Sequence, residues 1–303
     1  MFWKLIPGRS MVLLMALALL PTLSVPSPAD LPDDETYLAR ELARHRYVLL
    51  GEKHDNPEHH LIQARLLARM LELGRRPALV WEMVPRGKQR AIDVLAAGGH
   101  ADPDRFADAV GWAESGWPDW NIYRPVAEVA LAARLPMVAG NIDRETVGQL
   151  ARNPESADPI LRKTLRLEAR LPADVRGAVA EEIYRGHCAL VPHERLEPMI
   201  RVQVARDASL AEAMVRAATT ADGAVLIAGG QHARRDIGAG YHLAHRFGAR
   251  DIVSLALIER GGEEPALPDA ALSRKFDFVW FTDRAYPDRD YCAELEARFG
   301  KHK

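Results

Sequence analysis

Two short strings place a histidine just after an apolar run of the chain. "GEKH" ends the run that begins at Tyr47 and contains Glu52 and His54, and "GGQH" follows the run from Gly223 and contains His232. Both have Gly-x-x-His spacing, in which the glycine lets the backbone turn sharply while the imidazole points into a crevice. Histidine at such a position can transfer protons near neutral pH or bind a metal ion.

Glu82 adds a carboxylate to this pattern. It lies in "VWEMV" between Trp81 and Met83, so we expect it to be buried. An unpaired buried carboxylate costs several kcal/mol or has a raised pKa, and a histidine, an arginine or a metal ion could compensate it. The chemistry could be a divalent-metal site or an acid/base cluster, with Arg235 stabilising developing negative charge. A purely structural ion pair is the alternative. The proposed cluster comprises Glu52, His54, Glu82 and His232.

Six apolar runs are expected to be strands, and helical patterns separate them. Five of them are almost continuously apolar, which is typical of parallel strands covered on both faces. The predicted fold is therefore an α/β fold with three layers: an open, mostly parallel sheet with helices on both faces. Ligands bind such sheets beyond the carboxyl ends of the strands, where the proposed cluster lies. The expected strands are 47–52, 78–83, 135–142, 223–230, 251–258 and 276–282.

The helices between these strands carry their own signals. Asn56 is a candidate N-cap with Pro57 at the first helical position, and Gly74 follows the last turn. The stretch from about 146 to 219 contains no strand candidate and is expected to be a helical insertion. The mature chain, residues 30–303, is expected to be a single domain.

An aromatic stretch lies between Gly111 and Val126. It contains Trp112, Trp117, Trp120 and Tyr123. One interpretation is a packed corner that holds the preceding loop on the sheet. The other is a flat apolar wall for a planar ligand, in which Tyr123 would be an iron ligand, because tyrosinate is a known haem ligand.

Four further histidines are secondary candidates. His59 and His60 lie in the first turn of the expected helix after Asp55 and cannot both face His54. His187 and His193 lie in the expected insertion.

The N-terminus has the pattern of a secretory signal peptide. Lys4 and Arg9 precede the apolar run Met11–Leu20, and a small-residue cleavage site ends at Ala29. An uncleaved membrane anchor is the alternative. Cleavage would change the formal net charge from −2 to about −4, so no basic field for nucleic acid is present. We expect an exported protein, periplasmic or secreted.

The chain has two cysteines, Cys188 and Cys292. In an oxidising compartment such a pair often forms a disulfide, and two unpaired buried thiols are the alternative.

Several of these strings together resemble the ChaN-like haem-binding uptake family, within a superfamily that includes erythromycin esterases and Tiki-type peptidases. They are "LLGEKHDNPEHH", "SGWPDWNIYRPV", "AGGQHARRDIG" and "FDFVWFTDRAYPDRDYCAEL", and the resemblance spans about 46–299. Family members are often lipoproteins, but this chain has no lipobox cysteine. It also has no Cys-x-x-Cys-His, so any haem would bind non-covalently.

The resemblance implies a haem-binding protein that serves iron uptake, with Tyr123, Trp120 and His54 as candidate haem contacts. The partners it suggests are haem, a second subunit, and a peripheral membrane or uptake-system protein. In the superfamily's enzymes the first Gly-x-x-His and its associated acids form the active site. The second hypothesis is therefore a metal-dependent peptidase or esterase that uses Glu52, His54, Glu82 and His232, with Arg235.

Overall fold

The computed structural model describes residues 35–99, 101–261 and 269–300. The expected signal peptide lies outside these residues. None of the helices in the described ranges is long and apolar enough to cross a membrane.

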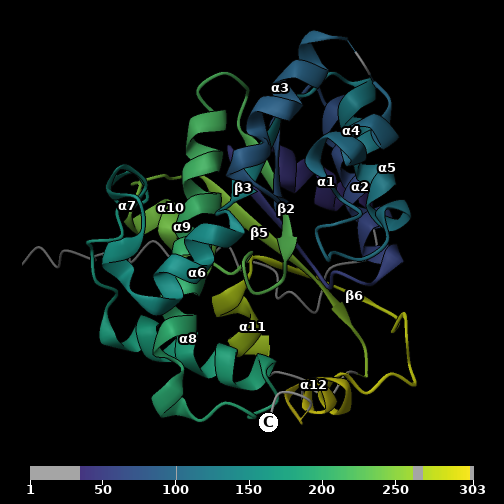
Figure 1. The fold of residues 1–303 in the computed structure, drawn as a ribbon. Helices are drawn as coiled ribbons and strands as arrows, with labels where there is room; N and C mark the ends of the chain where they lie inside the picture. Colours follow the sequence, from purple (N-terminus) through teal and green to yellow (C-terminus); the bar gives the residue numbers. More distant parts are fainter. Residues whose placement is uncertain (1–34, 100, 262–268, 301–303) are drawn as a thin grey trace, which may run out of the picture.

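The six expected strands form one parallel sheet, so the predicted fold class is confirmed (Figure 1). The strand order is β3-β2-β4-β1-β5-β6. Almost every residue of the four central strands is buried, as their continuous apolar sequences predict. The strands are β1 (Tyr47–Glu52), β2 (Ala78–Pro85), β3 (Met137–Asn141), β4 (Ala224–Gly229), β5 (Ile252–Glu259) and β6 (Phe278–Thr282).

Twelve helices in the described residues surround this sheet (Figure 1). Between β3 and β4 the chain forms helices and no strand. Short 3-10 turns occur at Arg86–Lys88, Pro154–Ser156 and His193–Arg195. The helices are α1 (Glu35–Ala43), α2 (Pro57–Glu72), α3 (Gln89–Ala97), α4 (Pro103–Val110), α5 (Trp120–Ala132), α6 (Arg144–Arg152), α7 (Pro159–Thr164), α8 (Ala173–Gly186), α9 (Glu197–Ala217), α10 (Ala239–His245), α11 (Asp269–Lys275) and α12 (Tyr291–Gly300).

Two hydrophobic cores cover the two faces of the sheet. Helices α1 to α5 contribute to one core, which includes Leu66, Trp81 and Phe106. Helices α9 and α10 contribute to the other, which includes Leu226 and Leu243. Helices α8 and α12 lie toward one end of the sheet (Figure 1).

Local sequence explains where α2 begins and ends. The Asn56 side chain accepts a hydrogen bond from the Glu58 amide at 2.9 Å, and Pro57 occupies the first helical position. Gly74, with a φ of 85°, turns the chain away after the last turn. This helix then covers one face of the sheet and leads from β1 to β2.

The strand order creates a switch point between β1 and β4. From β1 the chain passes through α2, on one face, to β2. From β4 it passes through α10, on the other face, to β5. Because the two connections leave in opposite directions, a crevice forms beyond the carboxyl ends of these adjacent strands.

Candidate functional site

The expected cluster assembles at this switch point. Glu52 ends β1 and His54 follows it, His232 follows the neighbouring β4, and Glu82 lies on β2, on the other side of β4. Both glutamates are buried, whereas the His54 side chain keeps 31% of its surface exposed. His54 is thus the member of the cluster that reaches solvent.

Glu52 is held by three aromatic or imidazole side chains. Its Oε1 atom accepts hydrogen bonds from the Tyr123 hydroxyl at 2.9 Å and from His54 Nδ1 at 3.0 Å. His60 Nδ1 lies 2.8 Å from Oε2. Burial alone would raise the pKa of Glu52, but the charge of His60 and hydrogen bonds from both histidines lower it well below its usual value. Glu52 is therefore a buried anion.

His60 compensates this buried charge. Its Nε2 atom donates to the His54 carbonyl at 3.0 Å, and its Nδ1 atom also lies 3.2 Å from Gln63 Oε1. Burial opposes its protonation, but the charge of Glu52 outweighs burial and raises the pKa of His60. His59 faces the other way, toward Lys53 and Thr282, and burial lowers its pKa to about 4. As expected, the two histidines do not both face His54.

Glu82 and His232 form the second half of the cluster. Glu82 Oε1 lies 3.1 Å from His232 Nε2, and Glu82 Oε2 accepts from the Gly229 amide at 2.8 Å. His54 Nε2 is 3.8 Å from the same Oε2 atom, so Glu82 lies between two imidazoles. Burial would raise the pKa of Glu82, but His232 and His54 lower it to about 2.

Asp207, which the sequence interpretation did not identify, completes the cluster from α9. Its Oδ1 atom lies 2.6 Å from His232 Nδ1. Burial lowers the pKa of His232, but Glu82 and Asp207 outweigh it and raise that pKa to about 10. Burial raises the pKa of Asp207. The sequence feature that could have identified Asp207 is its position on the buried face of a long amphipathic helix.

The whole cluster pairs three carboxylates with three imidazoles. His232 and His60 direct both ring nitrogens at oxygen acceptors, which leaves neither with a lone pair for a metal ion. Within the described ranges, no group of three or more His, Cys, Asp or Glu side chains is arranged to hold a metal ion. In this geometry the four residues expected to bind a divalent metal form two close pairs, Glu52 with His54 and Glu82 with His232, and their role as metal ligands stays a prediction.

The structure does not bring Arg235 to the cluster. Its side chain is exposed and pairs with Asp277, because the turn after β4 points it away from the crevice. The preceding residue, Arg234, is buried and pairs with Glu182 and Asp236. An arginine is therefore present at this edge, one position earlier than expected.

The aromatic stretch packs against the cluster from the side. Tyr123 and Trp112 are buried with ring centroids 4.8 Å apart, and Trp112 lies 4.9 Å from Trp120. Trp120 donates through Nε1 to Asp104 at 3.1 Å. Trp117 lies 4.8 Å from the ring of His54. The geometry is that of a packed corner. A cavity of about 580 Å³ borders the three tryptophans of this stretch.

Tyr123 is fully buried, and burial together with Glu52 raises its pKa far above the usual value. Its hydroxyl donates to Glu52, so it is held as a neutral phenol. The assignment of Tyr123, Trp120 and His54 as haem contacts stays a prediction.

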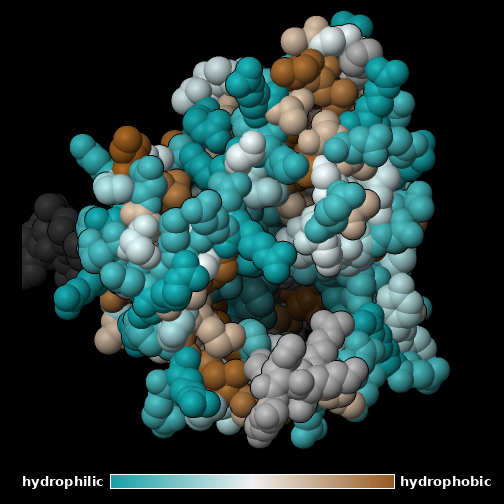
Figure 2. Space-filling view, viewed as in Figure 1, coloured by the Kyte–Doolittle hydropathy of each residue, from teal (hydrophilic) through white to brown (hydrophobic). Residues whose placement is uncertain are grey.

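A cavity of about 720 Å³ opens beside the cluster at the carboxyl edge. Its volume falls within the range of roughly 300–1,000 Å³ that is typical of small-molecule and cofactor sites. Figure 2 shows a hollow with apolar surface at its bottom, in the region where Figure 1 places α8, α11 and α12 around the strand ends. Its apolar lining comes from Ala256, Leu257, Ile258, Leu272 and Phe276.

Polar groups occupy the rest of the lining. Lys53, Arg234, Lys275 and Arg284 supply positive charge, and His54 connects the cavity to the cluster. Lys53 is paired with Glu259 at 2.7 Å, and its ammonium group lies 3.9 Å from the centre of the Tyr291 ring.

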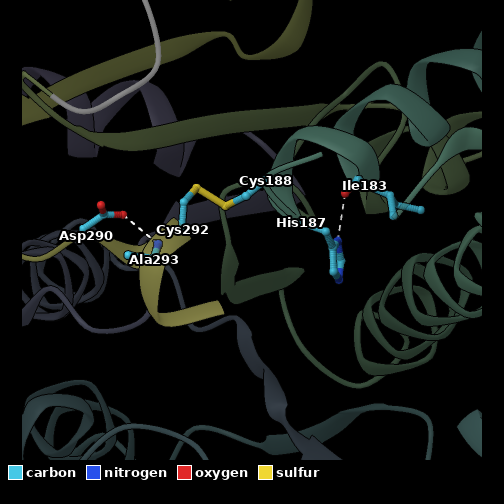
Figure 3. Close-up of a disulfide and its surroundings, with 6 residues drawn as sticks. All are labelled: Ile183, His187, Cys188, Asp290, Cys292 and Ala293. Atoms are coloured by element: carbon cyan, nitrogen blue, oxygen red, sulfur yellow. Dashed lines mark hydrogen bonds between the residues drawn. A yellow bond between two sulfur atoms is a disulfide. The ribbon is translucent and has the colours of Figure 1, made fainter. Parts of the chain in front are cut away.

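A disulfide joins two elements beside this cavity. Cys188 follows α8, Cys292 lies in the first turn of α12, and their Cα atoms are 5.6 Å apart (Figure 3). The preceding residue on each side, His187 and Tyr291, lines the cavity. The structure therefore has the disulfide, not two free thiols.

The fold and this site define an α/β protein with a cavity and a charged cluster at the carboxyl edge of a parallel sheet. Residues 38–243 match the family model described as "Haem-binding uptake, Tiki superfamily, ChaN". The chain belongs to this family, as its sequence resemblance predicts. Among proteins with curated descriptions, none matches this sequence.

One solved structure of the family is similar in fold. ChaN of Campylobacter jejuni, whose structure is described as showing cofacial heme binding, has a TM-score of 0.63 at 19% identity and covers 80% of this chain and 89% of its own. The type III effector HopBA1 has a TM-score of 0.47 at 13% identity and covers 83% of this chain and 94% of its own. An erythromycin esterase in its open conformation has a TM-score of 0.42 at 16% identity and covers 80% of this chain and 78% of its own. With TM-scores below 0.5, these two add nothing to the assignment.

Proposed function

We propose that this protein binds haem non-covalently in the cavity at the carboxyl edge of the sheet. The observation that carries the proposal is the character of the lining, which is apolar along β5 and α11 and elsewhere contains four cationic side chains beside the carboxylates of Glu52 and Glu259. Haem combines a flat apolar ring with anionic propionates, so it needs both kinds of surface. Membership of a family described as haem-binding supports the proposal.

Arg284 is the cation best placed to receive a propionate. Its guanidinium donates to the Arg289 carbonyl at 3.3 Å, and no carboxylate of the described residues pairs with it. The other arginine of the lining, Arg234, is already held by Glu182 and Asp236. A free guanidinium can bind a carboxylate through two parallel hydrogen bonds.

The test is a haemin titration of the purified protein, followed by the Soret absorbance. We expect saturable binding, and we expect Arg284→Glu to weaken it by about tenfold or more, because one charge-assisted contact is worth roughly 1.5–3 kcal/mol. Arg40→Glu, an identical charge change at an exposed position of α1, is the matched control. Equal haemin affinities of the two variants would contradict the role of Arg284 in binding a propionate.

We also propose that the protein is exported and serves haem or iron uptake. The N-terminal pattern supports export, and so does the Cys188–Cys292 disulfide, because such bonds persist mainly in oxidising compartments. The mass of the mature chain from cell fractions would test this, with residues 1–29 expected to be absent from a periplasmic or secreted form. A second subunit and an uptake-system partner stay predictions.

A further inference from the structure

The cavity beside the aromatic stretch has no part in the haem proposal. Its volume of about 580 Å³ lies within the range of roughly 300–1,000 Å³ that is typical of small-molecule sites. It shares no lining residue with the cavity at the carboxyl edge of the sheet. Three indole rings and four carboxylates line it, and the lining contains no lysine, arginine or histidine. These side chains are Trp112, Trp117, Trp120, Asp104, Asp108, Glu114 and Asp119.

Two of the three tryptophans have no hydrogen-bond donor left for a ligand. The indole N–H of Trp112 donates to the Pro118 carbonyl at 2.9 Å, and that of Trp120 donates to Asp104 at 3.1 Å. The planes of these two rings meet at 61°, so they do not form one flat wall. Trp117 and Trp120 are half-buried, which leaves part of each ring accessible. The aromatic surface therefore suits a compact group better than a large planar one.

Two of the four carboxylates form no side-chain hydrogen bond or ion pair in the described part of the chain. They are Asp108, on α4, and Glu114, in the loop before α5, and both are exposed. Asp104 pairs with Arg124 at 3.1 Å, and Asp119 accepts a hydrogen bond from a backbone amide of α5 at 2.8 Å. Only one of the four is therefore paired with a cation.

Lys88 lies close to this lining without pairing with it. A Cβ atom at Gly111 would lie 3.2 Å from Lys88 Nζ and 3.6 Å from Glu114 Oε2, so both charged groups approach this glycine. Within the described ranges the two side chains nevertheless form no ion pair. Even when Lys88 and Arg124 are counted, four carboxylates face two cations, and a net negative charge remains.

A cavity with indole walls and an excess of carboxylates fits a positively charged organic group. Cations bind over aromatic ring faces, most strongly over tryptophan, and quaternary ammonium groups are recognised in this way. Such a group donates no hydrogen bonds, so it needs ring faces and negative charge rather than particular acceptors. The carboxylates would repel an anionic group on the same ligand. We propose that this cavity binds a small organic cation that carries a quaternary ammonium group and no anionic group.

The experiment titrates choline into the purified full-length chain at low ionic strength, followed by isothermal calorimetry. The uncharged carbon isostere of choline, dimethylbutanol, is the first control, because it has the same shape without the positive charge. Ethanolamine has a primary ammonium group and phosphocholine has an added phosphate, so these two compounds test the two chemical features of the proposal. We expect choline to bind saturably and each of the other three to bind more weakly, dimethylbutanol by about tenfold or more.

Two kinds of variant separate the charge from the aromatic surface. Asp108→Asn with Glu114→Gln removes the two unpaired charges at exposed positions, and we expect the choline affinity to fall by about threefold or more. Asp174→Asn with Glu194→Gln makes the same changes at exposed positions outside this lining and should leave the affinity unchanged. Trp117→Leu should weaken binding by about fivefold. Circular dichroism melts verify that each variant folds.

Three results would overturn the proposal. The absence of saturable choline binding by the wild type would show that the cavity is not a cation site. Equal affinities for choline and dimethylbutanol would show that the cavity selects shape and not charge. Equal losses of choline affinity in the two double variants would show that the carboxylates of the lining play no part.

Sedimentation with phosphatidylcholine vesicles distinguishes a free cation from a lipid headgroup, which carries the same quaternary ammonium group. The proposal predicts no co-sedimentation, because the carboxylates of the lining repel the headgroup phosphate. Co-sedimentation that free choline competes away would overturn the restriction to ligands without an anionic group. The outcome is independent of haem binding, since the two cavities share no lining residue.

Discussion

At the scale of single residues, the site depends on buried charges that compensate one another. Glu82 is almost fully buried but keeps its charge, because His232 and His54 lie on its two oxygens. The sequence predicted that this carboxylate would need partners, and the two histidines are those partners. Removing one partner of such a pair is strongly destabilising, since it leaves an uncompensated charge.

The shifted pKa values predict how stability depends on pH. The pKa of His232 is raised to about 10, so its contribution is complete below 6.5 and is lost as pH rises toward 10. The pKa of Glu82 is lowered to about 2, so its contribution is present above 4.5 and is lost toward pH 2. His59, whose pKa is lowered to about 4, and His242, whose pKa is lowered to about 3, oppose folding as pH falls below 6.5. The free energy of unfolding should therefore be highest near pH 6.5.

Urea unfolding at a series of pH values measures this dependence. The alkaline range gives the clearer test, because in acid the raised pKa of Asp207 and the lowered pKa of Glu82 change the stability in opposite directions. Between pH 7 and 9 we expect a loss of about 1.4 kcal/mol per pH unit from His232 alone. His232→Gln should flatten this slope. A slope unchanged in that variant would show that another group is responsible.

Gly229 permits the close approach of His54 to β4. A Cβ atom at this position would lie 2.7 Å from His54 Nε2, so alanine would displace the imidazole from its position beside Glu82. We expect Gly229→Ala to lower the free energy of unfolding by about 1–3 kcal/mol. In the control, Gly230→Ala, the nearest atom is 3.6 Å away, and little change is expected. Equal denaturant midpoints for both variants would contradict this explanation.

Some residues of the site could not be found from the sequence. Asp207 reaches the cluster from α9, which no local pattern connects to the end of β4. Arg234 and Arg235 are neighbours, and only the path of the turn after β4 decides which one faces the crevice. Glu52, His54, Glu82 and His232 could be predicted together because parallel strands bring their carboxyl ends to one edge.

At the scale of elements, the apolar runs and capping residues were sufficient to predict the sheet. All six strands occur where expected, and α2 begins at its Asn56-Pro57 signal. The placement of α8 and α12 could not be predicted in this way, because no periodicity shows which part of the sheet they approach. Their position beside the cavity depends on long-range contacts, among them the disulfide.

The disulfide should stabilise the fold through its long loop. Cys188 and Cys292 are 104 residues apart, and closing a loop of that length is worth about 4–5 kcal/mol in the chain-entropy model. The double variant Cys188→Ser with Cys292→Ser should lose several kcal/mol of unfolding free energy, measured by denaturant at pH 7. The wild type treated with a reductant should match it. A loss below about 1 kcal/mol would show that the bond adds little to this fold.

At the scale of the whole molecule, the strand order places one cavity and one charged cluster side by side. The cluster is built from the carboxyl ends of β1, β2 and β4 together with α2 and α9, whereas the cavity is lined by β5, α8, α11 and α12 as well. Glu52, His54 and His232 belong to both. The carboxyl edge of the sheet therefore holds the charge-compensated cluster. Strand β5 and the surrounding helices supply the apolar and cationic surfaces that the proposed ligand requires.

The most direct measurement is a crystal structure of the protein with haemin bound, in which anomalous scattering locates the iron. We predict that the iron lies inside the cavity of about 720 Å³ at the carboxyl edge. Iron beside Trp120, in the cavity that borders the three tryptophans, would contradict the proposed site and favour the aromatic stretch as the haem surface.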